Sequence, residues 1–175
     1  MRKICVNKKI LFLIDFVVIV VLIIVDQFTK HLAVTGLKGQ QPIVIFKDVL
    51  ELEYLENRGV AFGLFQNQRF MILLTGFLFM VAICFIMYRM PVGKKFTILH
   101  VVFSCIIAGG IGNMIDRAAL GYVVDFISFV LIDFPIFNVA DCYVVCATIV
   151  LFVMFLFVLS EDDLDFLSFS KAKEN

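Results

Sequence analysis

Four long runs of apolar residues dominate the hydrophobic pattern of the chain. The runs occupy residues 10–28, 70–88, 96–115 and 139–159. Each is close to the ~20 residues that an α-helix needs to cross a bilayer, so the pattern predicts four transmembrane helices. The first run ends in V-D-Q-F-T-K and lacks a small-x-small cleavage motif, which favours an uncleaved anchor over a secretory signal. We therefore expect a single membrane domain across residues 1–175.

The segments between the runs predict additional elements. Residues 36–69 form a long loop in which Val49–Glu56 alternates apolar and acidic residues, as in a strand with one apolar face. Residues 42–46 are a candidate partner strand, and the two predict a small extracytoplasmic β-sheet. The segment between the third and fourth spans is expected to lie on the membrane surface as a short helix. Residues 160–175 form an acidic tail, expected to be disordered or to lie on the surface, and we assign it no function.

The distribution of lysine and arginine predicts the orientation of the spans. Four basic residues precede the first span, and three lie in the short loop of residues 89–95. Because basic loops stay in the cytoplasm, both termini are expected there, and the loop of residues 36–69 is expected to face outward. That loop also carries four basic residues, so the bias is modest.

Composition narrows the class of protein. The chain is 62% hydrophobic with a mean hydropathy of +1.05, well above the 45–50% apolar content typical of soluble domains. Its formal net charge is zero and it has no basic patch interleaved with aromatic residues, so nucleic acid is not an expected partner.

The five cysteines do not predict a disulfide framework or a metal site. Four of them lie in apolar stretches, where a thiol packs as a small hydrophobic group. Cys142 and Cys146 are one helical turn apart, but both histidines are far from them in sequence. We therefore expect neither a metal ion nor an organic cofactor.

Two acids, Asp125 and Asp141, lie where an apolar membrane chain should carry none. A charged residue at bilayer depth costs roughly 2.5–3.5 kcal/mol on insertion scales, so such residues are kept mainly for function. Asp125 is flanked by apolar residues, which should raise its pKa. Asn138 suits the N-cap of the fourth span, where the helix dipole favours an ionised Asp141. We hypothesise that Asp125 holds the proton and Asp141 the charge, although a capping role alone remains open for Asp141.

Further polar residues lie near these acids in the predicted fold. Asn113, Asp116 and Arg117 share one face at the outer end of the third span, which favours a supporting role over an isolated ion pair. Asp26 and Lys30 have the i, i+4 spacing of a helical ion pair.

Two other acids receive no role. Asp15 is expected to reach toward the cytoplasmic headgroups, because it lies only about a turn and a half beyond Lys9. Asp133 precedes Pro135 in a predicted turn, where it is expected to be solvated or to cap.

Five sequence blocks together resemble the lipoprotein signal peptidases, or signal peptidase II family, which are bacterial membrane aspartic proteases. The blocks are D-Q-F-T-K (residues 26–30), N-R-G-V-A-F-G (57–63), G-G-I-G-N-M-I-D-R (109–117), V-V-D-F-I (123–127) and F-N-V-A-D (137–141). They occur in the order and spacing of the family and span most of the chain. Cys142 and Cys146 depart from the family pattern, which more often has small residues such as Ser and Gly there.

The resemblance implies that Asp125 and Asp141 are the catalytic pair. It implies that the remaining matched polar and glycine positions bind substrate or support the site: Asn57, Gly59, Asn113, Asp116, Arg117, Asn138, Asp26 and Lys30. The implied substrate is a prolipoprotein with a diacylglyceryl group on its lipobox cysteine, cleaved on the N-terminal side of that cysteine. The implied setting is the bacterial cytoplasmic membrane, with the active site toward the extracytoplasmic face, and we expect a monomer in contact with membrane lipid.

Other functions remain as alternatives. Intramembrane aspartyl proteases of a second type use a G-x-G-D motif, but this sequence contains no Gly-Asp dipeptide. The serines have no histidine and acid arranged for Ser/His catalysis. A small proton- or ion-coupled transporter is the non-enzymatic alternative. It is disfavoured because the polar residues gather toward one membrane face, whereas a transport path should continue to the other.

Overall fold

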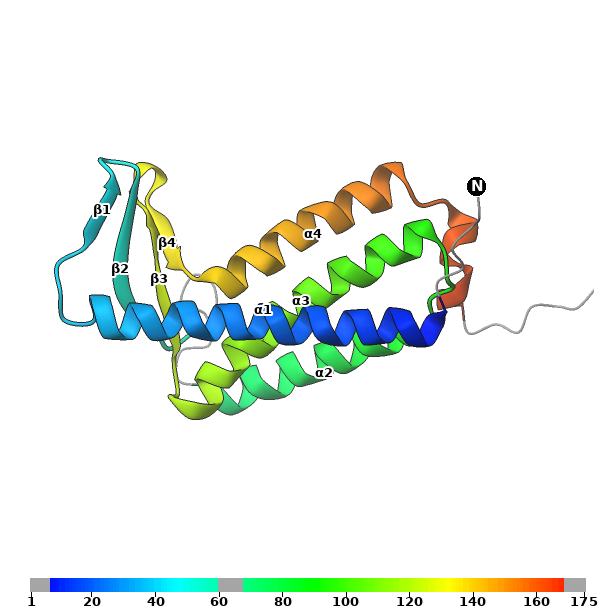
Figure 1. Cartoon of the computed structure of the whole chain (residues 1–175), viewed down its shortest axis with the longest axis horizontal. Helices are drawn as coiled ribbons and strands as arrows, with labels where there is room; N and C mark the ends of the chain where they lie inside the picture. The colour runs from blue at the N-terminus through cyan, green and yellow to red at the C-terminus, as the bar shows by residue number, and fades with distance from the viewer. Residues whose placement is uncertain (1–6, 60–67, 169–175) are drawn as a thin grey trace, which may run out of the picture.

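The computed structural model describes residues 7–59 and 68–168, which form four long helices with a four-stranded sheet at one end (Figure 1). The helices are α1 (Lys8–Leu37), α2 (Arg69–Arg89), α3 (Lys94–Ala119) and α4 (Val139–Phe157). The strands are β1 (Ile43–Phe46), β2 (Leu50–Asn57), β3 (Val123–Phe129) and β4 (Phe134–Phe137). Within the described residues, each of the four helices is long and apolar enough to cross a bilayer. The predicted class of a helical membrane fold with a small sheet is therefore confirmed.

Helix α1 extends well past the predicted span. Its 30 residues give a length of about 45 Å, which exceeds the ~30 Å hydrocarbon core of a bilayer. The additional turns bury Ala33 and Leu37 against Val124 and Phe126 of β3. Polar residues lower the hydropathy of this end, but the apolar face continues at helical spacing. As a result α1 carries the sheet as well as crossing the membrane.

The sheet has the order β1-β2-β3-β4, and every neighbouring pair is antiparallel. The β1–β2 hairpin matches the two strands expected in the outward loop. The segment expected to form a short surface helix is instead mainly β3 and β4, joined by the three-residue 3-10 helix η2 (Val130–Ile132). The run V-V-D-F-I-S-F is rich in β-branched and aromatic residues, so it pairs with β2 instead of forming a helix. Asp125 consequently lies on a central strand, paired opposite Leu55.

Helix α3 occupies the centre of the bundle and packs against α1, α2 and α4. Two glycines allow the closest approaches, as the small residues of this span predict. A Cβ at Gly109 would lie 2.5 Å from the backbone oxygen of Ala140 and 2.7 Å from Val144 Cγ2 on α4. A Cβ at Gly112 would overlap the Asp26 carboxylate on α1. The bundle is therefore tightest at the end nearest the sheet.

A buried ion cluster joins α1 to α3 beside Gly112. The Lys30 Nζ lies 3.0 Å from Asp26 Oδ2 and 3.0 Å from Asp116 Oδ2, and all three side chains are buried. The expected Asp26–Lys30 pair is confirmed, and Asp116 adds a second acid from α3. Gln27 completes the cluster, because its Nε2 donates to Asp116 Oδ1 at 3.0 Å and to Asp26 Oδ2 at 3.2 Å. Together the four side chains fix how α1 and α3 meet in the halves nearest the sheet.

The opposite end of the bundle is closed by part of the acidic tail. Residues Glu161–Leu167 form the 3-10 helix η3 at the end where α1 begins and α4 finishes (Figure 1). Lys95 Nζ lies 2.6 Å from Asp163 Oδ2, and the rings of Phe96 and Phe166 pack edge to face with centroids 5.8 Å apart. This part of the tail is therefore ordered on the surface of the bundle, so of the two expectations, a disordered tail or one that lies on the surface, the second describes residues 161–167.

The tight contact at Gly109 predicts a stability difference between neighbouring glycines. Gly109→Ala should lower stability by about 1–3 kcal/mol, because the new methyl group meets backbone that cannot move aside. Gly110 is the matched control, since a Cβ there would lie 3.8 Å from Met80 Sδ, an ordinary contact. Thermal unfolding in detergent micelles would measure both, and a Gly109→Ala variant as stable as Gly110→Ala would contradict this packing.

The buried ion cluster predicts that Lys30 cannot be neutralised without loss. Lys30→Met should destabilise the protein by roughly 3–5 kcal/mol, because it leaves two buried carboxylates without a cation. Lys38→Met is the control, since that lysine is half-exposed and pairs with Glu56 at the surface. Denaturant or thermal unfolding of both variants tests this, and equal midpoints would show that Lys30 is not structurally required.

Candidate active site

The two acids singled out by the sequence come from different elements that meet where the sheet joins the bundle. Asp125 lies on β3, and Asp141 lies in the first turn of α4. Asn138 is the N-cap of α4, as predicted: its Oδ1 accepts from the Asp141 backbone N–H at 3.1 Å. In return, Asp141 Oδ2 accepts from the Asn138 backbone N–H at 3.1 Å, which completes a capping box. The cap fixes the position of Asp141 at the entrance to α4.

Two asparagines link the acids into one network. Asn138 Nδ2 donates to Asp125 Oδ1 at 2.6 Å and to Asn113 Oδ1 at 3.0 Å. Asn113 Nδ2 in turn donates to Asp141 Oδ1 at 2.8 Å. Each carboxylate is therefore held by an amide, and the two amides bond to each other.

The orientation of these amides is set by the ion cluster. Lys30 Nζ donates to Asn113 Oδ1 at 2.8 Å, so the NH₂ group of Asn113 must turn toward Asp141. Asp26 Oδ1 accepts from the Ala140 backbone N–H at 3.0 Å, which ties the first turn of α4 to α1. The cluster thus determines where the head of α4 lies and which atoms it faces.

The same cluster also positions β3. Asp116 Oδ2 accepts from the backbone N–H of Val124, next to Asp125, at 3.1 Å. The two elements that carry the site carboxylates are thus each bonded to a different acid of the cluster: α4 to Asp26, and β3 to Asp116.

The end of β2 supplies a third asparagine. Asn57 Nδ2 donates to Asp125 Oδ2 at 2.9 Å, and its Oδ1 accepts from the Gly59 backbone N–H at 3.0 Å. The Arg117 guanidinium donates to the Gly59 carbonyl at 2.7 Å. These bonds fix the start of the loop next to Asp125. Residues 60–63 of the N-R-G-V-A-F-G block lie outside the described residues.

The two acids differ in environment. Asp125 is only 1% exposed, and desolvation by this burial is the main cause that raises its pKa to about 6. The bonds from Asn57 and Asn138 lower the pKa, whereas the negative charge of Asp141 raises it further. The raised pKa agrees with the apolar flanks seen in the sequence. Asp141 is only half-buried.

All ten residues expected in the site belong to one connected network with the geometry given above. Sequence reasoning missed Gln27 and the two backbone donors at Ala140 and Val124. Gln27 lies inside the matched D-Q-F-T-K block, which was the available signal. Asp15, in contrast, does not reach the headgroups, because it is buried against His100 of α3. On each of the two helices, this pair lies several turns away from the candidate site.

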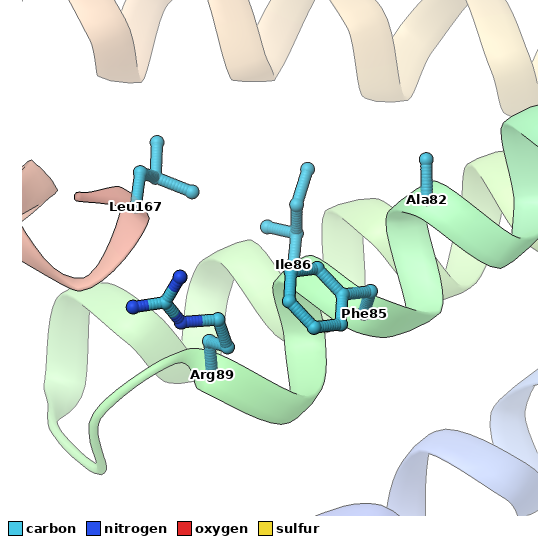
Figure 2. A pocket seen from close by; sticks show the side chains of 5 residues that line it. All are labelled: Ala82, Phe85, Ile86, Arg89 and Leu167. Atoms are coloured by element: carbon cyan, nitrogen blue, oxygen red, sulfur yellow. The ribbon is translucent and has the colours of Figure 1, made fainter. Parts of the chain in front are cut away.

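The described part of the chain contains no group of three or more His, Cys, Asp and Glu side chains placed to hold a metal ion. Cys142 and Cys146 are free thiols beside an apolar groove of about 370 Å³ between α3 and α4. A second cavity of about 340 Å³ lies at the opposite end from the acids, between α2 and Leu167 of η3 (Figure 2). Its lining is apolar apart from Arg89, so it offers no acid–base chemistry.

A family model and individual relatives match the chain over most of its length and indicate the same family. The model of the family described as signal peptidase (SPase) II matches residues 18–157. A lipoprotein signal peptidase of Clostridium tetani is 44% identical over 153 residues, which cover 85% of this chain and 94% of that protein. A lipoprotein signal peptidase of Streptococcus thermophilus is 40% identical over 135 residues, which cover 77% and 87% of the two chains.

Solved structures agree with the sequence relatives. A structure described as a bacterial membrane enzyme aligns with a TM-score of 0.68 at 25% identity, covering 92% of this chain and 93% of the other. A second with the same description has a TM-score of 0.69 at 26% identity, covering 83% and 94%. The four spans, the antiparallel sheet, the family model and the named relatives lead to one assignment. The chain belongs to the signal peptidase II family of lipoprotein signal peptidases, which are multi-pass membrane peptidases that cleave signal peptides from prolipoproteins.

Proposed function

We propose that the chain cleaves diacylglyceryl-modified prolipoproteins on the N-terminal side of the lipidated cysteine, by an aspartic mechanism in which Asp125 and Asp141 activate a water molecule. One observation carries the proposal: two carboxylates from separate elements are held in a single network by Asn113 and Asn138. An ion pair or a helix cap alone would not need this shared arrangement, because Asp141 already completes its cap without Asp125.

Peptide hydrolysis needs a base for the water and an acid for the carbonyl oxygen and the leaving nitrogen. Asp141 is the proposed base, because amide and backbone N–H groups donate to both its oxygens and it lies at the positive end of α4. As Asp141 takes a proton from the water, the oxygen attacks the scissile carbonyl carbon. Asp125 carries the other proton and donates it to the carbonyl oxygen, which stabilises the tetrahedral intermediate. Collapse of that intermediate breaks the C–N bond, and the leaving nitrogen receives the proton from Asp141. As the new carbonyl forms, one hydroxyl of the intermediate returns its proton to Asp125, so both acids regain their starting states.

The raised pKa of Asp125 supports this division of roles. A carboxyl group with a pKa of about 6 retains its proton over a wider pH range than an ordinary aspartate does. In the substrate complex the peptide would displace further solvent, which would raise the pKa again. The difference between the two acids therefore arises from their positions, one on a buried strand and one at a helix N-terminus.

The supporting residues have three proposed tasks. The cluster of Asp26, Lys30 and Asp116 holds the elements, and the three asparagines hold the carboxyl groups. Arg117 and Gly59 fix the loop start beside Asp125, where Asn57 is suited to bind the substrate backbone.

The setting of the site follows from the spans. We infer that the sheet and both acids face the extracytoplasmic side of the bacterial cytoplasmic membrane. The basic loop of residues 89–95 lies at the other end of the bundle, where the positive-inside rule places the cytoplasm. Both termini would then be cytoplasmic. The acyl chains of the substrate would remain in lipid while the peptide reaches the acids, and one chain, acting as a single membrane domain, would suffice as a monomer.

Removing either site carboxylate should abolish cleavage without unfolding the protein. Asp125→Asn and Asp141→Asn should each lower kcat by on the order of 10²–10⁴-fold, because each removes a proton-transfer group. The matched control is Asp133→Asn, which changes an exposed acid in a left-handed turn that asparagine also tolerates. The measurement is cleavage of a purified diacylglyceryl-modified lipobox peptide, with thermal unfolding to verify the fold.

Two results would contradict the proposal. A folded single variant with near-normal cleavage would remove that acid from the pair. Equal cleavage of modified and unmodified peptides by the unaltered protein would keep the peptidase activity but discard the requirement for the lipid.

The pH dependence of cleavage should report the state of Asp125. If its protonated form is required, kcat/KM of the unaltered protein should fall as the pH rises through about 6. The bond from Asn57 lowers this pKa, so Asn57→Ala should raise it and move the alkaline limb to higher pH. A pH series of initial rates measures both profiles. An alkaline limb that stays in place or moves to lower pH would assign it to another group.

A further inference from the structure

A second buried polar cluster joins the same two helices in the inner half of the bundle. His100 Nδ1 lies 2.7 Å from Asp15 Oδ2, and Ser104 Oγ donates to Asp15 Oδ1 at 3.3 Å. His100 and Ser104 are fully buried, and Asp15 is 5% exposed. Asp15 lies seven residues into α1, so the cluster is about 10 Å from the start of that helix. It lies in the inner half of the membrane, where polar groups are costly.

The inner cluster is separate from the candidate active site. Asp15 and Asp26 are eleven residues apart on α1, a rise of about 16 Å. On α3 the buried residues between Ser104 and Gly112 are apolar or glycine: Ile106, Ile107, Ala108 and Gly109. Because no polar group bridges this interval among those buried residues, the two clusters do not form a continuous proton path. The inner cluster therefore requires a different explanation from the transporter alternative.

Burying His100 carries a free-energy cost, which indicates that its contact with Asp15 has a role. A carboxylate accepts from the ring N–H at Nδ1, so Nε2 is left to find its own partner. Nε2 of His100 is buried and has no hydrogen-bond partner in the described part of the chain. A phenylalanine or leucine would fill the space without this penalty. The polar pair therefore supplies a directional contact between α1 and α3, which apolar packing would not.

Helix α1 packs closely along α3, but most of that contact is apolar and not directional. Its buried residues are Leu11, Asp15, Asp26, Lys30, Ala33 and Leu37. Most of its remaining surface faces outward, and lipid gives no hydrophobic drive for helices to associate. Within the described residues, the directional contacts between α1 and α3, which are hydrogen bonds, come from the two polar clusters.

We propose that Asp15 and His100 are positioning residues that hold α1 in the register at which Lys30 reaches Asn113. Eleven residues make close to three helical turns, so Asp15 and Asp26 share a face of α1 to within about 20°. A rotation that takes Asp15 away from His100 also turns the Asp26–Lys30 pair away from α3. The effect on cleavage rests on the proposed function, whereas the effect on register does not.

Cleavage kinetics test the positioning role. Asp15→Leu and His100→Leu, which remove the acceptor and the donor, should each lower kcat by on the order of 10- to 100-fold with little change in KM, because a displaced Lys30 misorients the amides and not the substrate contacts. The double variant should lose no more than the worse single variant. The exchanged pair, Asp15→His with His100→Asp, should recover most of the rate, since it restores the contact. Thr75→Val is the control, as that hydroxyl bonds the Met71 and Ile72 carbonyls of its own helix.

A distance measurement tests the register without relying on peptidase activity. Spin labels at positions 32 of α1 and 115 of α3, both exposed, would be introduced after replacing the five native cysteines with alanine. His100→Leu should broaden or shift the label-to-label distance distribution measured by pulsed electron resonance. An unchanged distribution, or single variants with normal kcat, would overturn the proposal. A changed distribution in a protein that cleaves no lipidated peptide would support the positioning role and reject the proposed function instead.

Discussion

The arrangement depends on one buried cation. Lys30 lies between Asp26 and Asp116, and each of these acids also accepts a backbone N–H from a different element: the first turn of α4 in one case and β3 in the other. A single ammonium group thereby fixes α1, α3, α4 and β3 relative to one another. Replacing a buried ion cluster with apolar side chains is often neutral or stabilising, so the reason to keep it is geometric. It adds directional bonds to elements that otherwise meet mainly through apolar packing.

The chemistry follows from this geometry through the asparagines. Because Lys30 bonds to the side-chain carbonyl oxygen of Asn113, the NH₂ group of Asn113 faces Asp141. Asn138 then donates to both Asn113 and Asp125. The carboxyl groups then acquire different properties from their locations. A central strand removes solvent from Asp125, whereas a helix N-terminus supplies donors to Asp141. In the proposed mechanism, these two environments give two identical side chains opposite roles in proton transfer.

Local patterns in the sequence predicted much of this structure. Hydropathy located the four spans, i, i+4 spacing found Asp26 and Lys30, and the Asn138 cap followed from its place before an apolar run. The missing parts depend on contacts distant in sequence. β3 and β4 become strands because β2 is available to pair with them, and Asp15 is buried because His100, 85 residues away, lies opposite it. Single-helix rules assign an acid near a helix start to the headgroups, since they contain no information on which helix faces meet.

In this arrangement, burial and the neighbouring negative charge of Asp141 together raise the pKa of Asp125. The most direct test is a carbon-13 NMR titration of the aspartate carboxyl groups in the unaltered protein and in Asp141→Asn. This arrangement predicts a midpoint of about 6 for Asp125, and a lower midpoint once the neighbouring negative charge is removed. A midpoint near the ordinary value of 3.8 that is unaffected by Asp141→Asn would contradict it.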